Sequence, residues 1–104
     1  MNHQANTLRG EAEFICAGET LRLRPSFENL VAAEEEIGSL FALVERASQG
    51  GMTVSEITAL LWYCTDKDPR PPRAELGKAV LEMGLVKATK PVRAILAQVL
   101  QGQT

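Results

Sequence analysis

The feature that most restricts the fold is a run of alternating apolar and polar residues that leads directly into a helix start. Ala12, Phe14 and Cys16 occupy one set of alternate positions, and Leu21 and Leu23 repeat the pattern after a glycine. A period of two is typical of a half-buried strand, so the two runs predict a β-hairpin. Because an isolated hairpin is marginal in water, its apolar face must pack on helices or on another chain.

Residues 17–20 predict the turn of this hairpin. Gly18 stands where the first central residue of a two-residue type II′ turn needs a positive φ. If Ala17 lies opposite Thr20, the apolar residues share one face and the charged residues the other. The expected cross-strand pairs are Cys16 with Leu21, Phe14 with Leu23, and Glu13 with Arg24.

The remainder predicts helices with clear starts and stops. Ser26, Ser39 and Thr53 can each cap a helix, and Thr53 forms a capping box with Glu56. The expected helices cover about 27–37, 40–49, 54–65, 73–83 and 90–101, the last with Pro91 in its first turn. The apolar positions of the first helix are Phe27, Leu30, Val31 and Ile37, and those of the second are Leu40, Phe41, Leu43, Val44 and Ala47.

These elements predict an α+β fold, in which an N-terminal β-hairpin is followed by a bundle of four to five short α-helices. We expect a flexible leader at 1–7, a single domain at 8–101 and a flexible tail at 102–104. The helix at 54–65 is apolar over more than one stripe, which makes it either central or equipped with a second binding face. The three prolines between Asp66 and Pro72 predict a stiff exposed loop.

Candidate catalytic and ligand-binding residues are scarce. The one histidine, His3, falls in the predicted leader, and the two cysteines, Cys16 and Cys64, lie in apolar segments as buried free thiols do. The capping hydroxyl groups have no histidine to activate them, and the acidic run 34–36 is typical of a solvated helix face. We therefore expect no enzyme activity, no metal or cofactor and no small-molecule substrate.

Charge and hydropathy argue against two further classes of partner. Eleven basic and thirteen acidic residues give a net charge of -2, without the basic excess that phosphate binding requires. No apolar run approaches the roughly 20 residues that span a bilayer, and the first residues do not resemble a signal peptide. The expected location is the cytoplasm.

Protein binding is the remaining function class. Leu40, Phe41, Trp62 and Tyr63 exceed what a small core easily uses, and aromatic anchors favour protein interfaces. The alternative is that these side chains pack beneath the hairpin. Arg70, with its neighbours Lys67 and Arg73, could dock an acidic partner, although a solvated loop explains these charges as well.

The sequence resembles the gene transfer agent family of small phage-tail proteins, which is labelled a phage tail tube protein in some descriptions and is better understood as a tail assembly chaperone. The resemblance covers about Thr7 to Leu100 and is tightest at the Arg-Pro-Ser-Phe-Glu junction. It is carried by Arg9-Gly10-Glu11, Leu21 to Leu30, Glu34 to Gly38, Ile57, Leu60, Leu61 and Trp62.

This resemblance implies a chaperone that coats the tape measure protein, recruits the major tail protein and leaves before the particle is complete. Association with further copies of the chain is a third expected contact. The alternative is a structural tail tube or tail completion component that stays in the particle. A tube subunit needs a substantial β-sheet to close a ring, whereas the sequence predicts only two strands. An antitoxin-like regulator would need a basic recognition helix, and the sequence predicts none.

Overall fold

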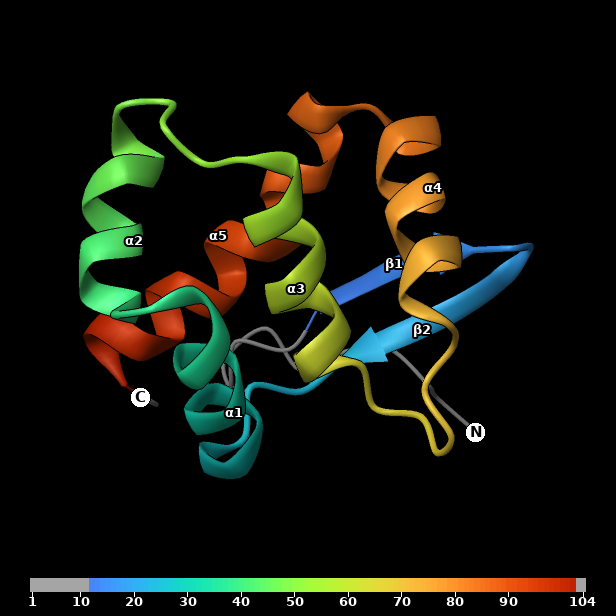
Figure 1. Ribbon diagram of the computed structural model, residues 1–104, viewed down its shortest axis with the longest axis horizontal. Coiled ribbons are helices and arrows are strands. Elements are labelled where there is room, and N and C mark those ends of the chain that lie inside the picture. The colour runs from blue at the N-terminus through green and yellow to red at the C-terminus, as the bar shows by residue number, and fades with distance from the viewer. Residues whose placement is uncertain (1–11, 103–104) are drawn as a thin grey trace.

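The computed structural model describes residues 12–102, which adopt an α+β fold (Figure 1). The hairpin precedes the helices, as the sequence predicts, and the described residues contain five helices. Their bounds are β1 (Ala12–Cys16), β2 (Glu19–Leu23), α1 (Phe27–Ile37), α2 (Leu40–Ser48), α3 (Val54–Cys64), α4 (Arg73–Met83) and α5 (Leu85–Gln101).

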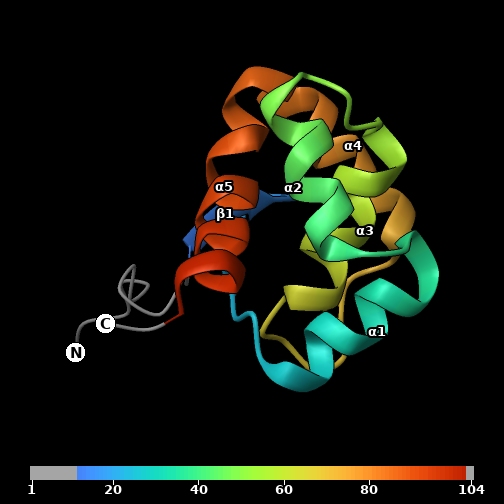
Figure 2. The same ribbon diagram turned by 90° about the vertical axis from the view of Figure 1, so that its left-hand side faces the viewer.

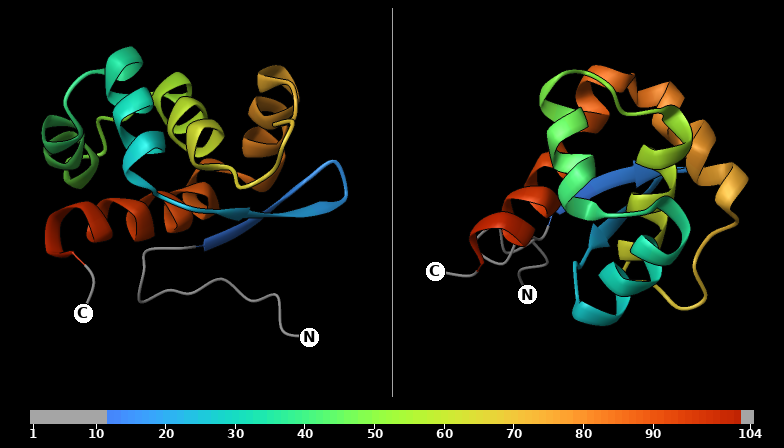
Figure 3. Two further views of the ribbon diagram at one scale, coloured as in Figure 1. Left: turned by 90° about the horizontal axis from the view of Figure 1, so that it is seen from below. Right: turned by 60° about the vertical axis from the view of Figure 1, so that its left-hand side comes forward.

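The elements form two layers around one core. The hairpin and α5 make one layer, and α1 to α4 lie across it (Figure 3, left). In the side view, α5 and β1 lie on the opposite side of the molecule from α1 (Figure 2). Helix α3 is central, because it packs against α1, α4 and α5, which decides between the two sequence interpretations of this helix. The largest fully buried side chains are Leu23, Leu43, Leu60, Leu61, Leu76, Ile95, Val80, Val92 and Cys64.

The hairpin buries the predicted face but has a different register. Ala17 and Gly18 are the central turn residues, with φ values of 53° and 79°, and two positive values are typical of a type I′ turn. The observed pairs are Ala12 with Leu23, Glu13 with Arg22, Phe14 with Leu21, Ile15 with Thr20, and Cys16 with Glu19. The predicted type II′ turn and its pairs are therefore wrong by two residues.

Bonds to residues at the end of α3 give a physical reason for this difference. In the predicted register the backbone groups of Arg22 and Arg24 would bond to β1. In the observed register they point away from β1, so that Arg22 O accepts from Asp66 N–H and Arg24 N–H donates to Cys64 O. Because a shift of two residues preserves the side-chain alternation, the face that carries Phe14 and Leu21 is still buried.

Helix α1 covers less of its apolar surface than the spacing suggests. Its cap is as predicted, with Ser26 Oγ accepting from Asn29 N–H at 3.2 Å. Phe27, however, is 79% exposed, and Val31 is also exposed. Helix α1 packs chiefly against α3, and that single contact covers only a narrow stripe around Ala33. Phe27 and Val31 therefore keep the apolar spacing of this helix without joining the core.

Helix α5 starts five residues earlier than predicted. It begins at Leu85 and contains Pro91 in its interior, whereas the sequence places Pro91 in the first turn. The earlier start places Ala88 in the core with no exposed surface. The ring of Pro91 is buried as well, so packing of this segment outweighs the backbone hydrogen bond that proline cannot make.

Candidate functional site

The end of α3, the loop 66–72 and the first residue of α4 build a cluster of two aromatic rings and two arginines. Trp62 and Tyr63 meet edge to face with 5.1 Å between ring centroids. The guanidinium of Arg73 lies 4.6 Å from the Trp62 ring centroid, and that of Arg70 lies 5.0 Å from it. Trp62 Nε1 donates to the carbonyl of Pro71 at 2.8 Å. Three of the five predicted partner-binding residues, Trp62, Tyr63 and Arg70, therefore lie together.

Arg70 links this loop to the helices. Its Nη2 donates to Tyr63 O at 2.9 Å and to Asn29 Oδ1 at 3.1 Å. Within residues 12–102 the structure gives Arg70 no carboxylate partner, and its buried Nε has no hydrogen-bond acceptor. The stiff loop is mostly exposed, as the sequence predicts, but Arg70 is half-buried and holds the loop against α1 and α3.

Arg73 and Tyr63 of this cluster both donate to one carboxylate, that of Glu36. Arg73 Nη1 donates to Glu36 Oε2 at 2.6 Å, and Tyr63 OH donates to Glu36 Oε1 at 2.8 Å. The Arg73 hydrogen bond, followed by that of Tyr63, lowers the pKa of the Glu36 carboxyl group from its ordinary value. The acidic run 34–36 is thus more than a solvated face, because Glu36 fixes Tyr63 and Arg73.

The two remaining predicted residues, Leu40 and Phe41, separate at the start of α2. Leu40 is buried in the core, and its backbone N–H donates to Glu34 Oε2 at 3.0 Å. Phe41 is 65% exposed. Of this neighbouring pair, only Phe41 therefore offers its side chain to a partner.

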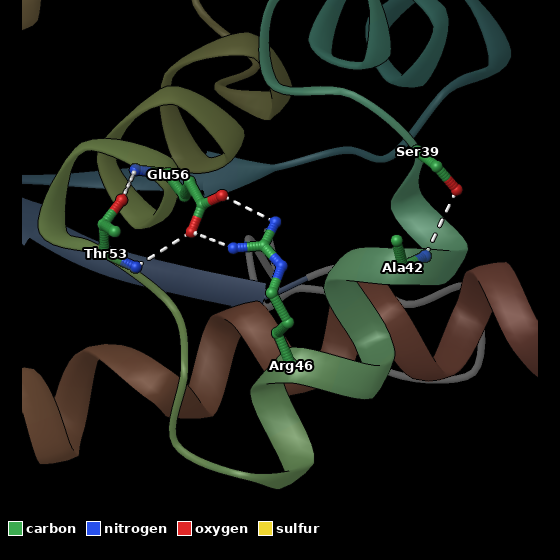
Figure 4. A network of polar contacts seen from close by, with 5 residues as sticks. All are labelled: Ser39, Ala42, Arg46, Thr53 and Glu56. Carbon is green, nitrogen blue, oxygen red and sulfur yellow. Dashed lines mark hydrogen bonds and ion pairs between the residues drawn. The ribbon is translucent and has the colours of Figure 1, made fainter.

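A separate polar network holds α2 against α3 (Figure 4). The predicted capping box is present, because Glu56 N–H donates to Thr53 Oγ1 at 3.0 Å and Thr53 N–H donates to Glu56 Oε1 at 2.9 Å. Arg46 Nη2 forms an ion pair with Glu56 Oε2 at 2.6 Å. The Arg46 hydrogen bond is the largest cause of the lowered pKa of Glu56. At the other end of α2, Ser39 Oγ accepts from Ala42 N–H at 3.2 Å. These bonds fix the helix from which Phe41 projects.

The sequence prediction missed a second exposed apolar surface, at the junction of α4 and α5. Leu81, Leu85 and Val86 are exposed there, and Val86 has 86% of its surface in solvent. We call these three residues the α4–α5 patch. Leu85 and Val86 also line a groove of about 230 Å³ with Met52 and Ile57. The prediction left 84–89 outside any helix, so Leu85 and Val86 were not expected on an ordered apolar surface.

The described residues offer little reactive chemistry. Cys16 and Cys64 are both buried free thiols, and burial raises the pKa of Cys64 to about 12. His3, the one histidine of the sequence, lies outside the described residues. No helix in the part of the chain described by the structure is long and apolar enough to cross a membrane.

Comparison with known proteins identifies a family. Residues 9–102 match the sequence model of a family described as "Phage tail tube protein, GTA-gp10". No curated protein and no solved structure gives a significant match.

Proposed function

Because the chain belongs to the phage tail tube protein GTA-gp10 family, we propose that it acts in tail assembly as a non-enzymatic chaperone of gene transfer agent or phage tails. Its proposed partners are the tape measure protein and the major tail protein, which it binds in the bacterial cytoplasm and then releases. The observation that carries this proposal is the exposed apolar surface on a small protein that has its own closed core.

The exposed surface has the character that a transient escort requires. Phe27 and Phe41 project from α1 and α2, and the α4–α5 patch lies at a different place on the fold. Exposed apolar residues of this kind favour contact with another protein. Each contact is small, so binding would be strong only where many copies line one long partner, and release of the copies remains easy.

The second candidate is a tail tube or tail completion component that remains in the particle. The printed description of the family favours this alternative, because it names a tube protein. The architecture of the described residues favours the chaperone, since residues 12–102 contain one sheet of two strands. A tube wall built from β-sheet would need more strands from each subunit or a rearrangement on assembly.

Quantitative mass spectrometry of purified particles separates the two candidates. A chaperone is expected in the producing cells and in complexes with the tape measure protein, but only in trace amounts in finished particles. A tube subunit is expected in copy numbers similar to those of the major tail protein. Stoichiometric recovery from particles would overturn the chaperone proposal.

A paired variant tests the role of the α4–α5 patch. Leu85→Ser with Val86→Ser removes exposed apolar surface, whereas Ala97→Ser on the exposed side of α5 is a matched control. When the tape measure protein is co-expressed, the double variant is expected to recover less soluble tape measure protein than the control. Circular dichroism confirms that both variants remain folded. Equal recovery would remove the patch from the proposed binding surface.

A further inference from the structure

The outward side of α1 combines exposed apolar side chains with acids. Phe27 and Val31 lie one helical turn apart and are both exposed. Glu28 and Glu35 are exposed as well, three residues before and four residues after Val31, which places them on the same side of the helix. Among the described residues, neither of these two acids forms an ion pair. We call Phe27, Glu28, Val31 and Glu35 the acidic face.

The groove of about 230 Å³ at the start of α5 has the opposite charge. Its lining is mostly apolar, and Arg93 is the one charged side chain among the described residues that form it. Lys90 is exposed one turn before Arg93, and α5 contains no acid. Glu56, which precedes the lining residue Ile57, is already paired with Arg46. We call this groove, together with Lys90, the basic groove.

The size and the walls of the basic groove indicate what it can hold. Its volume is below the roughly 300–1,000 Å³ of small-molecule pockets, so a single large side chain fits it better than a cofactor. The described residues that line it come from α2, α3, α5 and the loop between α2 and α3, and none of them belongs to a strand. Walls of this kind favour a helix that lies in the groove with its apolar side inward.

The acidic face and the basic groove lie at opposite ends of the molecule. In Figures 1 and 2 the loop between α2 and α3 and the start of α5 are at the upper end, and α1 is at the lower end. A closed two-fold dimer joined by both surfaces would require them to face the same partner. Surfaces at opposite ends instead allow one contact to repeat from copy to copy.

We propose that copies of this chain associate head to tail, with the acidic face of one copy bound in the basic groove of the next. Phe27 enters the groove, and Glu28 and Glu35 lie near Lys90 and Arg93 of the next copy. Each surface then meets the opposite charge, whereas either surface would meet like charges on its own counterpart. A tail protein at the α4–α5 patch would compete with this contact. The association is therefore independent of the proposed chaperone function and is tested on the chain alone.

Sedimentation velocity of the full chain tests the association. Because association follows mass action, the weight-average mass is expected to rise with concentration between about 1 and 500 μM and to pass the mass of a dimer. Sodium chloride is expected to weaken it, because salt screens the attraction between exposed charges. A mass that stays monomeric, or that stops at a dimer, would overturn the head-to-tail arrangement.

Charge-reversal variants test the two surfaces against each other. Glu28→Lys with Glu35→Lys makes the acidic face basic, and Lys90→Glu with Arg93→Glu makes the basic groove acidic. Each double variant alone is expected to be monomeric, because its two surfaces then carry like charges. An equimolar mixture is expected to associate, since each altered surface meets its complement on the other variant. A mixture that stays monomeric would contradict the proposed contact.

Two controls separate this contact from a general effect of net charge. A variant with all four reversals keeps the formal net charge of -2 and is expected to associate as the wild-type protein does. Lys78→Glu with Lys87→Glu changes the net charge as much as the groove variant does, but neither residue lines the basic groove. This control is expected to associate, and its failure to the same degree as the groove variant would overturn the proposal.

A pair of phenylalanine variants tests the side chain that enters the groove. Phe27 and Phe41 are both strongly exposed, at 79% and 65%, but only Phe27 belongs to the acidic face. Phe27→Ser is expected to raise the dissociation constant between copies at least about tenfold, because aromatic anchors often dominate an interface. Phe41→Ser is expected to leave this constant nearly unchanged. Equal effects of the two variants, with both proteins folded by circular dichroism, would remove α1 from the interface.

Discussion

Replacement of Ala17 by asparagine is expected to stabilise the protein. Ala17 has a φ of 53°, a left-handed conformation that costs alanine roughly 1 kcal/mol because its Cβ approaches the following carbonyl oxygen. Asparagine tolerates this conformation and is favoured at the first central position of a type I′ turn. Glycine would relieve the same strain, but it would also add conformational entropy to the unfolded chain and lose part of the gain.

The expected gain for Ala17→Asn is about 1 kcal/mol in the free energy of unfolding. For a domain of this size, that gain corresponds to a rise of about 5 °C in Tm. Urea denaturation followed by circular dichroism measures the gain directly, with an unchanged m-value as the sign that the unfolded state is not altered.

The matched control is Glu19→Asn, which lies next to the turn in the observed register. In the type II′ register suggested by the sequence, Glu19 would be a central turn residue and Ala17 a strand residue. Asparagine would then stabilise at Glu19 and not at Ala17. That pattern of results would refute the type I′ turn and the observed register of the hairpin.

Three further predictions concern the caps, the pH dependence and the thiols. Thr53→Ala removes the side-chain cap of α3 and is expected to lower the free energy of unfolding by about 1 kcal/mol in urea denaturation. The pKa of Glu56 is lowered in the folded state. Its stabilising contribution is therefore present above the unfolded pKa of about 4.5 and is lost as the pH falls through the folded pKa. In Glu56→Gln, the free energy of unfolding is expected to fall less steeply with decreasing pH on the acid side. Burial raises the pKa of Cys64 to about 12 and also raises that of Cys16. At a pH near 8, both thiols are therefore expected to react with a disulfide reagent only after denaturant is added. Rapid labelling of the native protein would contradict their burial.

The starts of α1, α2 and α3 were predictable because capping is a local interaction. Ser26, Ser39 and Thr53 each accept a hydrogen bond from a backbone N–H three residues later, and no tertiary information is needed to expect this. The buried face of the hairpin was predictable for a similar reason, since strand alternation fixes a face even when the register differs by two residues. The register itself was not predictable, because alanine in a left-handed turn position carries no recognisable signal.

Tertiary packing decided the elements that the sequence prediction missed. Helical spacing shows which apolar residues of α1 recur along the helix, but not how many neighbours cover them. Phe27 fits that spacing and still lies in solvent. The early start of α5 depends on the burial of Ala88 and Pro91 against other elements. From the sequence alone, a proline is expected near the start of a helix. Pro91 is tolerated in the interior of α5 because the surrounding core packs against it.

The predicted excess of aromatic side chains is divided between two uses in the structure. Trp62 and Tyr63 lie against Arg70 and Arg73, so much of their surface is already covered within the chain. Phe41 has no such cover. A partner that displaced the arginines would have to break the Arg73 ion pair and the Arg70 bonds to α1 and α3, whereas contact with Phe41 or the α4–α5 patch requires no such break. The apolar surfaces outside the arginine cluster are therefore the more accessible route for binding a partner.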